Sequence, residues 1–369
     1  MLPHLLQRLT AVIAQRLPAA RPGACGLSRR AFGAPALGLL VLGLLVLGLP
    51  GSAWTQRAPD PPATIEISAE RLNGFYHVDP ARRQFGLLEF RGGIVLTSPF
   101  KQFGGLSAIR VQPDGSSFIA LSDKGWWLTG RIVYDGTRPA GIADAQMAPM
   151  LAANGLSLAS LGWYDTESIA QDDGTLYVGI ERVNRIVKFD FGKDGLLARA
   201  HPIEVPPAVR GLPNNKGLEA MLFVPRGLPL GGTLVAISER GLNREGNLLA
   251  FLIGGPRPGS FAIKRSADFD ISDAALLPSG DLLVLERKFS WNEGLFIRLR
   301  RIRLADVGPG ALVDGQVLLE ADLGYAIDNM EGLSVHRGPG GETVLTMISD
   351  DNFSAVQRTL LLQFTLAEP

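Results

Sequence analysis

The chain has 369 residues, 46% of them hydrophobic, and its 36 basic and 36 acidic residues cancel. This length allows one large domain or two ordinary ones with a sizeable core. Five of the basic residues are arginines within positions 1–53, where no acidic residue occurs, so 31 basic residues face 36 acidic ones in the remainder. A mildly acidic body argues against nucleic acid as a partner, because nucleic-acid-binding surfaces need clustered positive charge.

Residues 1–53 have the features of an export signal. Ser28-Arg29-Arg30-Ala31-Phe32 is a twin-arginine pattern, residues 33–49 are rich in Leu and Gly, and small residues at 50–53 offer a cleavage site before Trp54. We therefore predict a cleaved signal peptide and a periplasmic or secreted protein that is exported by the twin-arginine route. The alternative is an uncleaved membrane anchor, which an apolar stretch just short of ~18 residues disfavours.

Residues 54–63 are rich in Pro and predict a linker, and residues 64–369 predict one all-β domain. In this domain, short runs of β-branched, aromatic and Leu residues lie between turn signals. Residues 143–161 are the exception, because their Ala, Met and Leu residues have loose helical spacing and predict a short helix. The only cysteine, Cys25, precedes the domain, which therefore has neither a disulfide nor a Cys-ligated metal.

Two acidic positions recur in five copies along the domain. An inner strand begins just after the first position, a Gly-containing turn follows, and a strongly apolar second strand ends in the second position. The first positions are Ser107, Glu167, Glu219, Asp273 and Glu331, which lie 60, 52, 54 and 58 residues apart. The second positions are Asp123, Glu181, Glu239, Glu286 and Asp350. A period of about 55 residues built from short strands predicts the blades of a β-propeller.

Each copy continues into a third strand, and most continue into a fourth, more polar one. The second strands are expected at 117–121, 176–180, 234–237, 282–285 and 344–348, and the third at 128–134, 184–189, 247–253, 294–299 and 358–364. The last copy has no room for a fourth strand before Pro369, so residues 93–98 are expected to complete it and protect the terminal edge. Residues 64–97 form either closure strands alone or a degenerate sixth blade. We predict a single propeller of five or six four-stranded blades and favour six.

The two acidic positions of each copy are expected at the same end of a blade, because the inner and second strands run antiparallel. Together they place up to nine carboxylates around one mouth of the central channel. Crowded carboxylates raise one another's pKa unless positive charge compensates them. One source of compensation is Ca²⁺, which takes about six to eight oxygen ligands. The other is the base that follows the second acid in four copies: Lys124, Arg182, Arg240 and Arg287.

This ring predicts Ca²⁺ as a cofactor and the four bases as groups that bind an anionic part of a substrate. The expected metal ligands are Glu167, Glu219, Glu239, Asp273, Glu331 and Asp350. Glu219 and Glu331 are also candidate catalytic residues, since a bound metal activates water for hydrolysis. His336, which follows Glu331 on the same expected strand, is a candidate general base, with a structural role as the alternative. The alternative for the acids is also structural, with each one accepting hydrogen bonds from a turn or pairing with an arginine of the next blade.

The chain from about Phe103 to its end resembles a known family. The segments that carry the resemblance are Phe103-Gly104-Gly105-Leu106-Ser107, Asp165-Thr166-Glu167-Ser168-Ile169, Asn215-Lys216-Gly217-Leu218-Glu219-Ala220, Leu285-Glu286-Arg287 and Asp328-Asn329-Met330-Glu331-Gly332-Leu333. Together they resemble the phytase-like domain family, which is described as having esterase-like activity linked to phytase. The resemblance implies a β-propeller, export from the cell and hydrolysis of an ester or phosphoester.

Two functions of different classes fit these features. The first is an exported, Ca²⁺-dependent hydrolase that acts as a monomer on a small ester or phosphoester, with a lactonase-like propeller as a variant. The second is a non-catalytic periplasmic propeller that binds a small ligand or an envelope protein and has a structural acid ring. Neither has a membrane partner after signal cleavage. A cluster of oxygen atoms around one point would favour the first function, and a channel plugged by Arg–carboxylate pairs would favour the second.

Overall fold

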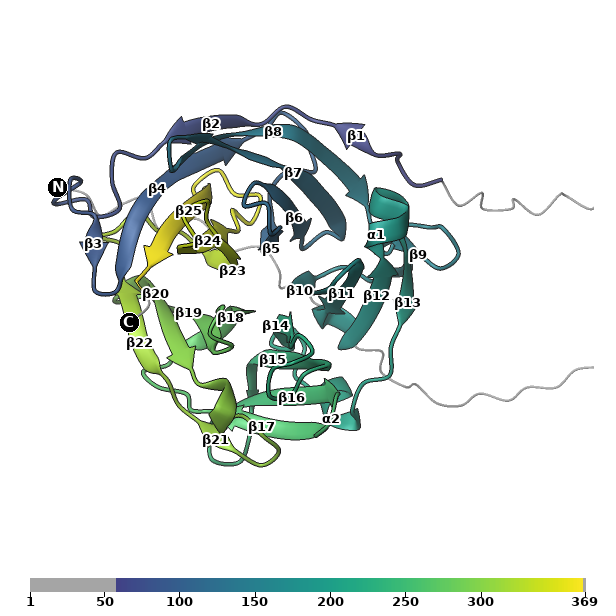
Figure 1. Cartoon of the computed structure of the whole chain (residues 1–369). Helices are drawn as coiled ribbons and strands as arrows, with labels where there is room; N and C mark the ends of the chain where they lie inside the picture. Colours follow the sequence, from purple (N-terminus) through teal and green to yellow (C-terminus); the bar gives the residue numbers. More distant parts are fainter. Residues whose placement is uncertain (1–57, 368–369) are drawn as a thin grey trace, which may run out of the picture. The chain divides into compact units, whose positions relative to one another are not determined.

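The computed structural model describes residues 58–367, which fall within one compact unit, Gln56–Pro369. Five sheets are arranged radially around a central axis (Figure 1), which confirms the all-β propeller. The predicted signal peptide, its cleavage site and the first part of the linker lie outside the described residues. No helix within residues 58–367 is long and apolar enough to cross a membrane.

The first three blades follow one another in chain order, and short strands from elsewhere extend their outer edges. The first blade consists of β5 (Leu106–Val111), β6 (Ser117–Ser122), β7 (Trp126–Asp135) and β8 (Arg138–Pro149), with β1 (Ala63–Thr64) outside β8. The second consists of β10 (Thr166–Asp172), β11 (Thr175–Ile180), β12 (Arg185–Asp190) and β13 (Arg199–Pro202), with β9 (Leu151–Ala152) outside. The third consists of β14 (Leu218–Phe223), β15 (Thr233–Leu242), β16 (Leu248–Gly254) and β17 (Gly259–Ile263), with β21 (Leu312–Val313) outside.

The fourth and fifth blades complete the circle. The fourth consists of β18 (Asp270–Leu276), β19 (Leu282–Ser290), β20 (Gly294–Ile302) and β22 (Gln316–Ala321). The fifth consists of β23 (Met330–Arg337), β24 (Thr343–Ser349), β25 (Thr359–Leu366), β4 (Leu88–Thr97) and β2 (Ser68–Arg71), and β3 (Gln84–Phe85) also pairs with β4. The helices are single turns: α1 (Phe191–Asp194), α2 (Pro207–Arg210), η1 (Ala159–Leu161), η2 (Glu181–Val183), η3 (Gly195–Leu197) and η4 (Leu304–Asp306).

The N-terminal strand closes the last blade, as predicted. β4 pairs antiparallel with β25, with Ile94 opposite Leu361 and Leu88 opposite Leu366. This pairing covers the edge that the end of the chain would otherwise expose. The preference for six blades was wrong, because the residues before β5 add strands to the fifth sheet and form no sheet of their own. β2, β3 and β4 join the fifth sheet, and β1 joins the first.

The helix expected within residues 143–161 was also wrong for most of that range. β8 runs through its first part, where exposed and buried side chains alternate: Asp144 and Gln146 are exposed, and Ala145 and Met147 are buried. This two-residue alternation is the strand period, and it outweighs the loose helical spacing of the apolar residues. Only η1 forms a helical turn there.

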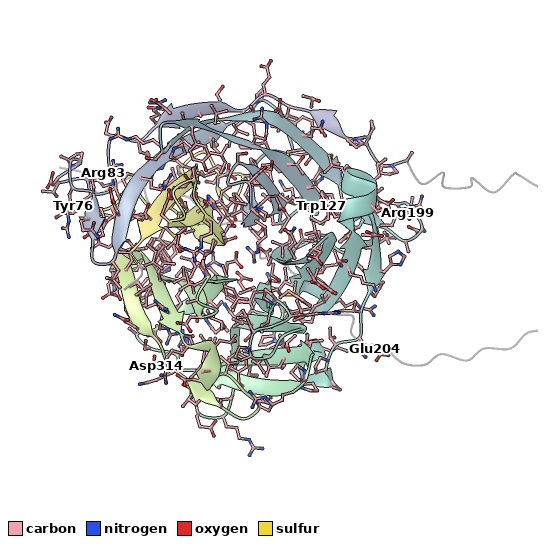
Figure 2. The ribbon with its side chains drawn as sticks, viewed as in Figure 1. Tyr76, Arg83, Trp127, Arg199, Glu204 and Asp314 are labelled. Carbon is pink, nitrogen blue, oxygen red and sulfur yellow. The ribbon has the colours of Figure 1, made fainter. Side chains whose placement is uncertain are left out.

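Apolar side chains fill the spaces between neighbouring blades. Trp127 of β7 is fully buried and packs edge-on against Phe189 of the second blade, with ring centroids 5.0 Å apart. In Figure 2, Trp127 lies inside the wall of the propeller, whereas Arg199, Glu204 and Asp314 lie at its outer rim. This packing fixes each blade against the next, so the ends of the inner strands hold constant positions around the axis.

Arg110 of β5 lies at the axis and contacts the inner strands of all the other blades. Its guanidinium donates hydrogen bonds to both carboxylate oxygens of Asp273, at 2.8 and 3.1 Å. It also donates to the backbone oxygens of Leu333 at 2.8 Å and Met221 at 2.9 Å, and to that of Ile169. One side chain therefore joins the five innermost strands and fills the axis at this level.

Candidate functional site

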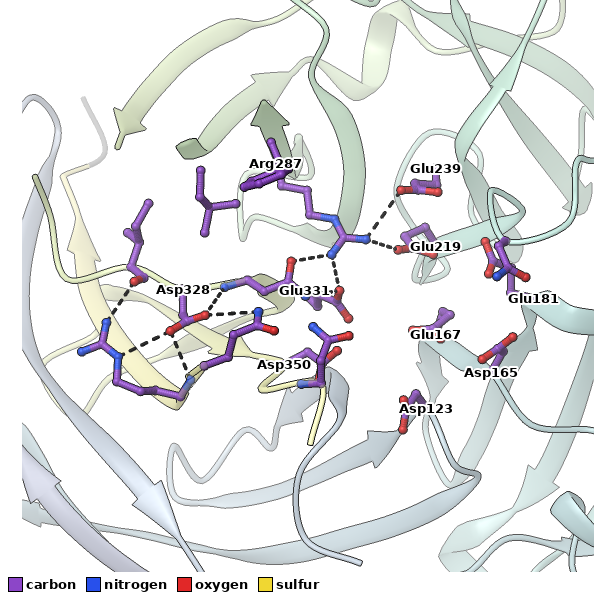
Figure 3. A pocket seen from close by; sticks show the side chains of 18 of the residues that line it. Asp123, Asp165, Glu167, Glu181, Glu219, Glu239, Arg287, Asp328, Glu331 and Asp350 are labelled. Carbon is purple, nitrogen blue, oxygen red and sulfur yellow. Dashed lines mark hydrogen bonds and ion pairs between the residues drawn. The ribbon is translucent and has the colours of Figure 1, made fainter. Parts of the chain in front are cut away.

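A cavity of about 830 Å³ opens at one mouth of the propeller axis. Nine carboxylates line it (Figure 3): Asp123, Asp165, Glu167, Glu181, Glu219, Glu239, Asp328, Glu331 and Asp350. Only two basic side chains, Arg287 and Arg358, line it with them. Seven of the nine predicted ring acids therefore line this mouth, and carboxyl groups outnumber basic groups there.

A β-bulge occurs near the start of each inner strand, and in three of the five blades the bulged residue lines the cavity. The pairing between the inner strand and the second strand shifts by one residue in every blade. The shifts occur at Ser107, Glu167, Glu219, Ser272 and Glu331. A bulged residue is left out of the ladder and its side chain is redirected, which is a common device beside active sites. The bulge thus explains why Glu167, Glu219 and Glu331 reach the cavity from the starts of three different strands.

The fourth blade is offset by one residue from the prediction. Its bulged residue is Ser272, so Asp273 belongs to the regular ladder, lies outside the cavity and binds Arg110. Ile271 pairs with Glu286, just as Leu106 pairs with Ser122 before Asp123 in the first blade. The second ring position of the fourth blade is therefore Arg287.

Asp273 and Glu286 are thus corrections to the predicted ring. Asp273 accepts hydrogen bonds from Arg110 and from the backbone nitrogen of Leu333 at 2.8 Å, so its carboxylate is already engaged. Glu286 is buried in ion pairs with Arg300 and, at 3.9 Å, with Arg298. Neither is placed to bind a ligand in the cavity.

Arg287 is the central cation of the ring. It forms ion pairs with Glu219 at 3.3 Å, with Glu239 at 3.5 Å and with Glu331, and it donates to Oδ1 of Asn329 at 2.5 Å. Burial opposes its charge, but Glu331, Glu219 and Glu239 outweigh burial and raise its pKa. Arg287 therefore stays charged and neutralises one side of the ring.

The other side of the ring has no arginine. Burial raises the pKa of Asp350 to about 8, with Glu331 and Asp123 adding to the shift, and burial raises that of Asp123 to about 6. Burial, followed by the charges of Glu331 and Glu181, holds the pKa of Glu167 well above its usual range. Within residues 58–367, no hydrogen-bond donor reaches the carboxyl of Glu167.

Glu181 lies within reach of the charges on both sides of the ring, since Glu239, Asp165 and Arg287 all affect its pKa. Its Oε1 accepts a hydrogen bond from the backbone nitrogen of Gly217 at 2.6 Å, which ties the second blade to the third. Burial raises its pKa to about 7, against the lowering effect of that hydrogen bond. The pKa of Glu181 therefore lies near neutral pH.

The ring has the donor type that suits Ca²⁺, but its present side-chain arrangement is not a coordination shell. All its anionic groups are oxygen donors, and Asn215, Asn329 and Asn352 add amide oxygens. Among the described residues, no three His, Cys, Asp or Glu side chains gather around one point as a metal site requires. Carboxylates on the side without Arg287 would have to move closer together to surround a cation.

Three of the four predicted substrate-binding bases do not line the cavity. Lys124 lies over the ring of Phe353, Arg182 stacks on Tyr164 with 4.3 Å to the ring centroid, and Arg240 pairs with Asp270. Adjacent residues in extended chain point in opposite directions, so a base directly after a ring acid faces away from it. Arg287 is the exception because it occupies a ring position itself.

His336 is not brought to the cavity either. It lies near the other end of β23 from Glu331 and lines a separate hollow with Pro113 and Leu277. Burial lowers its pKa to about 4, so it is neutral at pH 7. A general-base role in the acid cavity would need a contact that the fold does not provide.

Asp165, Asp328 and Arg358 also line the cavity, although they were not among the predicted site residues. Asp165 has a left-handed backbone (φ 59°), and its backbone oxygen accepts a hydrogen bond from the nitrogen of Glu181 at 2.8 Å. Arg358 comes from the β24–β25 loop and pairs with Asp328 at 3.4 Å. Asp165 precedes the bulged Glu167 by two residues, and Asp328 precedes the bulged Glu331 by three. An Asp shortly before the ring Glu in both motifs was the available signal.

The fold and the ring define a five-bladed propeller with an acidic mouth, and comparison with known proteins places it in a family. Residues 101–353 match the family described as phytase-like, with esterase-like activity of phytase. This match spans more than half of the chain, so the chain belongs to the phytase-like family, and the resemblance in its motifs is confirmed. No curated protein is detectably similar to the chain.

Two solved structures illustrate the similarity in fold. The endo-arabinase from Bacteroides thetaiotaomicron has 10% identity and a TM-score of 0.44, with 71% of this chain and 94% of that chain covered. The aldose sugar dehydrogenase from Streptomyces coelicolor, in its PQQ-bound form, has 14% identity and a TM-score of 0.39, with 82% and 100% covered. At these values, neither activity nor cofactor is carried over to this chain.

Proposed function

We propose that this protein is an exported hydrolase that cleaves an ester or a phosphoester in the acidic cavity. The observation that carries the proposal is the gathering of nine carboxylates and Arg287 in one cavity at the mouth of the axis. Because their pKa values spread around neutrality, the cavity holds proton donors and acceptors at the same pH. Membership of a family described by esterase-like activity supports the same reaction.

Glu181 is the proposed acid–base residue. In the reaction, water attacks the carbonyl carbon or the phosphorus atom, and the bond to the leaving oxygen breaks. Ionised Glu181 accepts the proton of water and then returns it to the leaving oxygen. Its pKa of about 7 suits both steps, because general acid–base catalysis works best when the pKa lies near the working pH. In this proposal Glu219 and Glu331 hold Arg287 in position.

Ca²⁺ is the proposed cofactor, and the side of the ring without Arg287 is its proposed site. Asp123, Glu167 and Asp350 would hold the ion there, since they face the cavity and lack an arginine partner. When bound, Ca²⁺ would neutralise these carboxylates and polarise the bond that is broken. Since the carboxyls must lose their protons to bind a metal, calcium affinity is expected to increase with pH.

A non-catalytic propeller is the second candidate. The observation that favours it is the contact of Arg287 with three ring carboxylates, which gives half of the ring a structural role. In this case the cavity binds a small ligand or an envelope protein without reaction, and Glu181 serves only to tie the second blade to the third.

The two candidates differ in a direct test. Full-length protein is assayed with chromogenic carboxylic esters and phosphoesters, with Ca²⁺ and with chelator, and its stability is measured under the same conditions. We expect Glu181→Gln to lower kcat by about 100-fold or more, as removal of a general base does. Exposed Glu70 is the matched control, and Glu70→Gln should retain full activity. No hydrolysis of either class in any condition would leave the non-catalytic propeller.

The calcium proposal has its own readout. Ca²⁺ at a hundredfold excess over Kd should stabilise the protein by about 2.7 kcal/mol. Glu167→Gln should shrink this gain, whereas Glu70→Gln should not. If the acids are only structural, neutralising Glu167 should raise stability by relieving repulsion, and Ca²⁺ should change little. Melting curves of the three proteins distinguish these results.

A further inference from the structure

One side of the cavity is apolar. Phe289, Leu295, Leu323, Ile327 and Val356 line it beside the carboxylates. Phe289 is 61% exposed, Leu323 58% and Val356 89%, so these side chains are uncovered although they border the candidate active site. These three side chains and the exposed Trp291 form the apolar rim: Phe289, Trp291, Leu323 and Val356.

The β19–β20 hairpin carries two of the rim residues, Phe289 and Trp291. β19 does not stop at its ring residue Arg287 but continues to Ser290, with Phe289 opposite Leu295 and Ser290 opposite Gly294. Trp291 at the tip packs edge-to-face on Phe289, with centroids 5.4 Å apart and an interplanar angle of 76°. Trp291 itself is 94% exposed.

Leu323 holds this hairpin from the side. Gly294 has a φ of +86°, and a Cβ at that position would lie 3.0 Å from Cδ1 of Leu323. Glycine therefore allows both the turn and the close approach of Leu323. The rim residues Phe289, Leu323 and Val356 also line the cavity, so the rim is continuous with the cavity wall.

The charges of the cavity select among ester classes. Both of its arginines are engaged, Arg287 with three carboxylates and Arg358 with Asp328. A phosphate monoester carries ~2 negative charges near neutral pH, so in the absence of Ca²⁺ it would meet an acidic lining without an unpaired guanidinium. A neutral carboxylic ester meets no such repulsion.

We propose that the substrate is a neutral carboxylic ester with an apolar acyl or aryl group that packs on the apolar rim while its ester bond reaches the carboxylates. This inference rests on the proposed hydrolase. Water adds to the carbonyl carbon, the bond from that carbon to the alkoxy oxygen breaks, and the proton of water passes to the leaving oxygen. The products are a carboxylic acid and an alcohol, and no oxidant or second substrate is needed.

The first test is a chain-length series. Full-length protein is assayed with p-nitrophenyl esters from acetate to octanoate. Burial of each added methylene on the rim should raise kcat/KM about two- to fourfold, mainly through KM. Phe289→Ser should flatten this increase, because the substituted rim offers less apolar surface to the longer acyl groups. Leu197, 59% exposed and outside the cavity lining, is the matched control, and Leu197→Ser should keep the increase.

The second test needs no catalysis. Trp291 fluorescence is followed during titration with N-propyl octanamide and N-propyl acetamide, which are uncleaved analogues with long and short acyl groups. We expect a blue shift of the emission with the octanamide but not with the acetamide. This shift should disappear in Trp291→Phe. This shift without hydrolysis of any ester would overturn the hydrolase and keep the rim as an apolar binding site. Hydrolysis with a flat chain-length series and no shift would overturn the rim inference alone.

Two further results would also overturn the inference. One is faster hydrolysis of p-nitrophenyl phosphate than of every carboxylic ester in the presence of Ca²⁺. The other is Phe289-dependent sedimentation with phosphatidylcholine vesicles together with a flat ester series, which would make the rim a membrane contact.

Discussion

Arg287 occupies a place that an acid occupies in the other four blades. Its three carboxylate partners, Glu219, Glu239 and Glu331, come from the third and fifth blades, so one guanidinium joins blades on both sides of its own. The exchange of an acid for an arginine lowers the repulsion within the ring and divides it into a neutralised half and an acidic half. The proposed chemistry depends on this division.

Removal of Arg287 should therefore cost stability. Arg287→Gln leaves three buried carboxylates without their cation, and loss of one partner of a buried pair costs about 3–5 kcal/mol. Urea unfolding near neutral pH measures this loss. Arg358→Gln is the control, since its ion pair is partly exposed and should be worth about 1 kcal/mol or less. Equal stability of the two variants would contradict the central role of Arg287.

The raised pKa of Asp350 predicts a pH dependence. The folded protein keeps this proton up to about pH 8, whereas the unfolded chain loses it near pH 4. The contribution to stability is thus complete below about pH 4 and is lost as pH rises through about 8. Without Ca²⁺, the free energy of unfolding should fall between about pH 5 and about pH 8. Asp350→Asn should reduce this fall by about 1 kcal/mol or more. An identical fall in the wild type and the variant would contradict the role of Asp350.

At the scale of the strand, the bulge decides which residues face the cavity. Glu167, Glu219 and Glu331 sit at the bulges of their strands, whereas Asp273 lies one residue beyond the bulge at Ser272. A shift of one residue in a strand sends a side chain to the other side. Asp273 therefore serves the axis through Arg110, although its local sequence resembles that of the ring acids.

Asp273 and Glu167 should consequently behave in opposite ways. Asp273→Asn breaks a buried pair with Arg110 and should cost about 3–5 kcal/mol, while any calcium response stays as large as in the wild type. Glu167→Gln should cost far less and should shrink that response. Denaturant unfolding with and without Ca²⁺ measures both effects. Loss of the calcium response in Asp273→Asn would indicate that Asp273 is a metal ligand.

For the whole molecule, closure by β4 and the axial contacts of Arg110 make one unit of five blades. Because β4 completes the last blade, the domain folds fully only when the start and the end of the described residues are both available. It therefore suits a route that exports folded proteins, and we propose the twin-arginine route for this chain.

The export proposal is tested on Arg29 and Arg30. Changing both to Lys keeps their charge but removes the twin-arginine pattern, so precursor should accumulate in the cytoplasm. Fractionation and immunoblotting measure this, and sequencing of the exported wild type should give an N-terminus near Trp54. Export of the double variant at the wild-type level would contradict the route.

The sequence by itself determined the propeller and most of its ring. The period of about 55 residues and the acids at the ends of neighbouring strands sufficed, because strand direction and repeat spacing are local properties. The bulge and the pairing between strands, which depend on the tertiary structure, place Arg287 rather than Glu286 in the cavity lining and keep Asp273 outside it. Tertiary structure also brought Asp328 and Arg358 to the cavity and used residues 64–97 as closure strands. These outcomes depend on contacts between distant segments, which no single segment encodes.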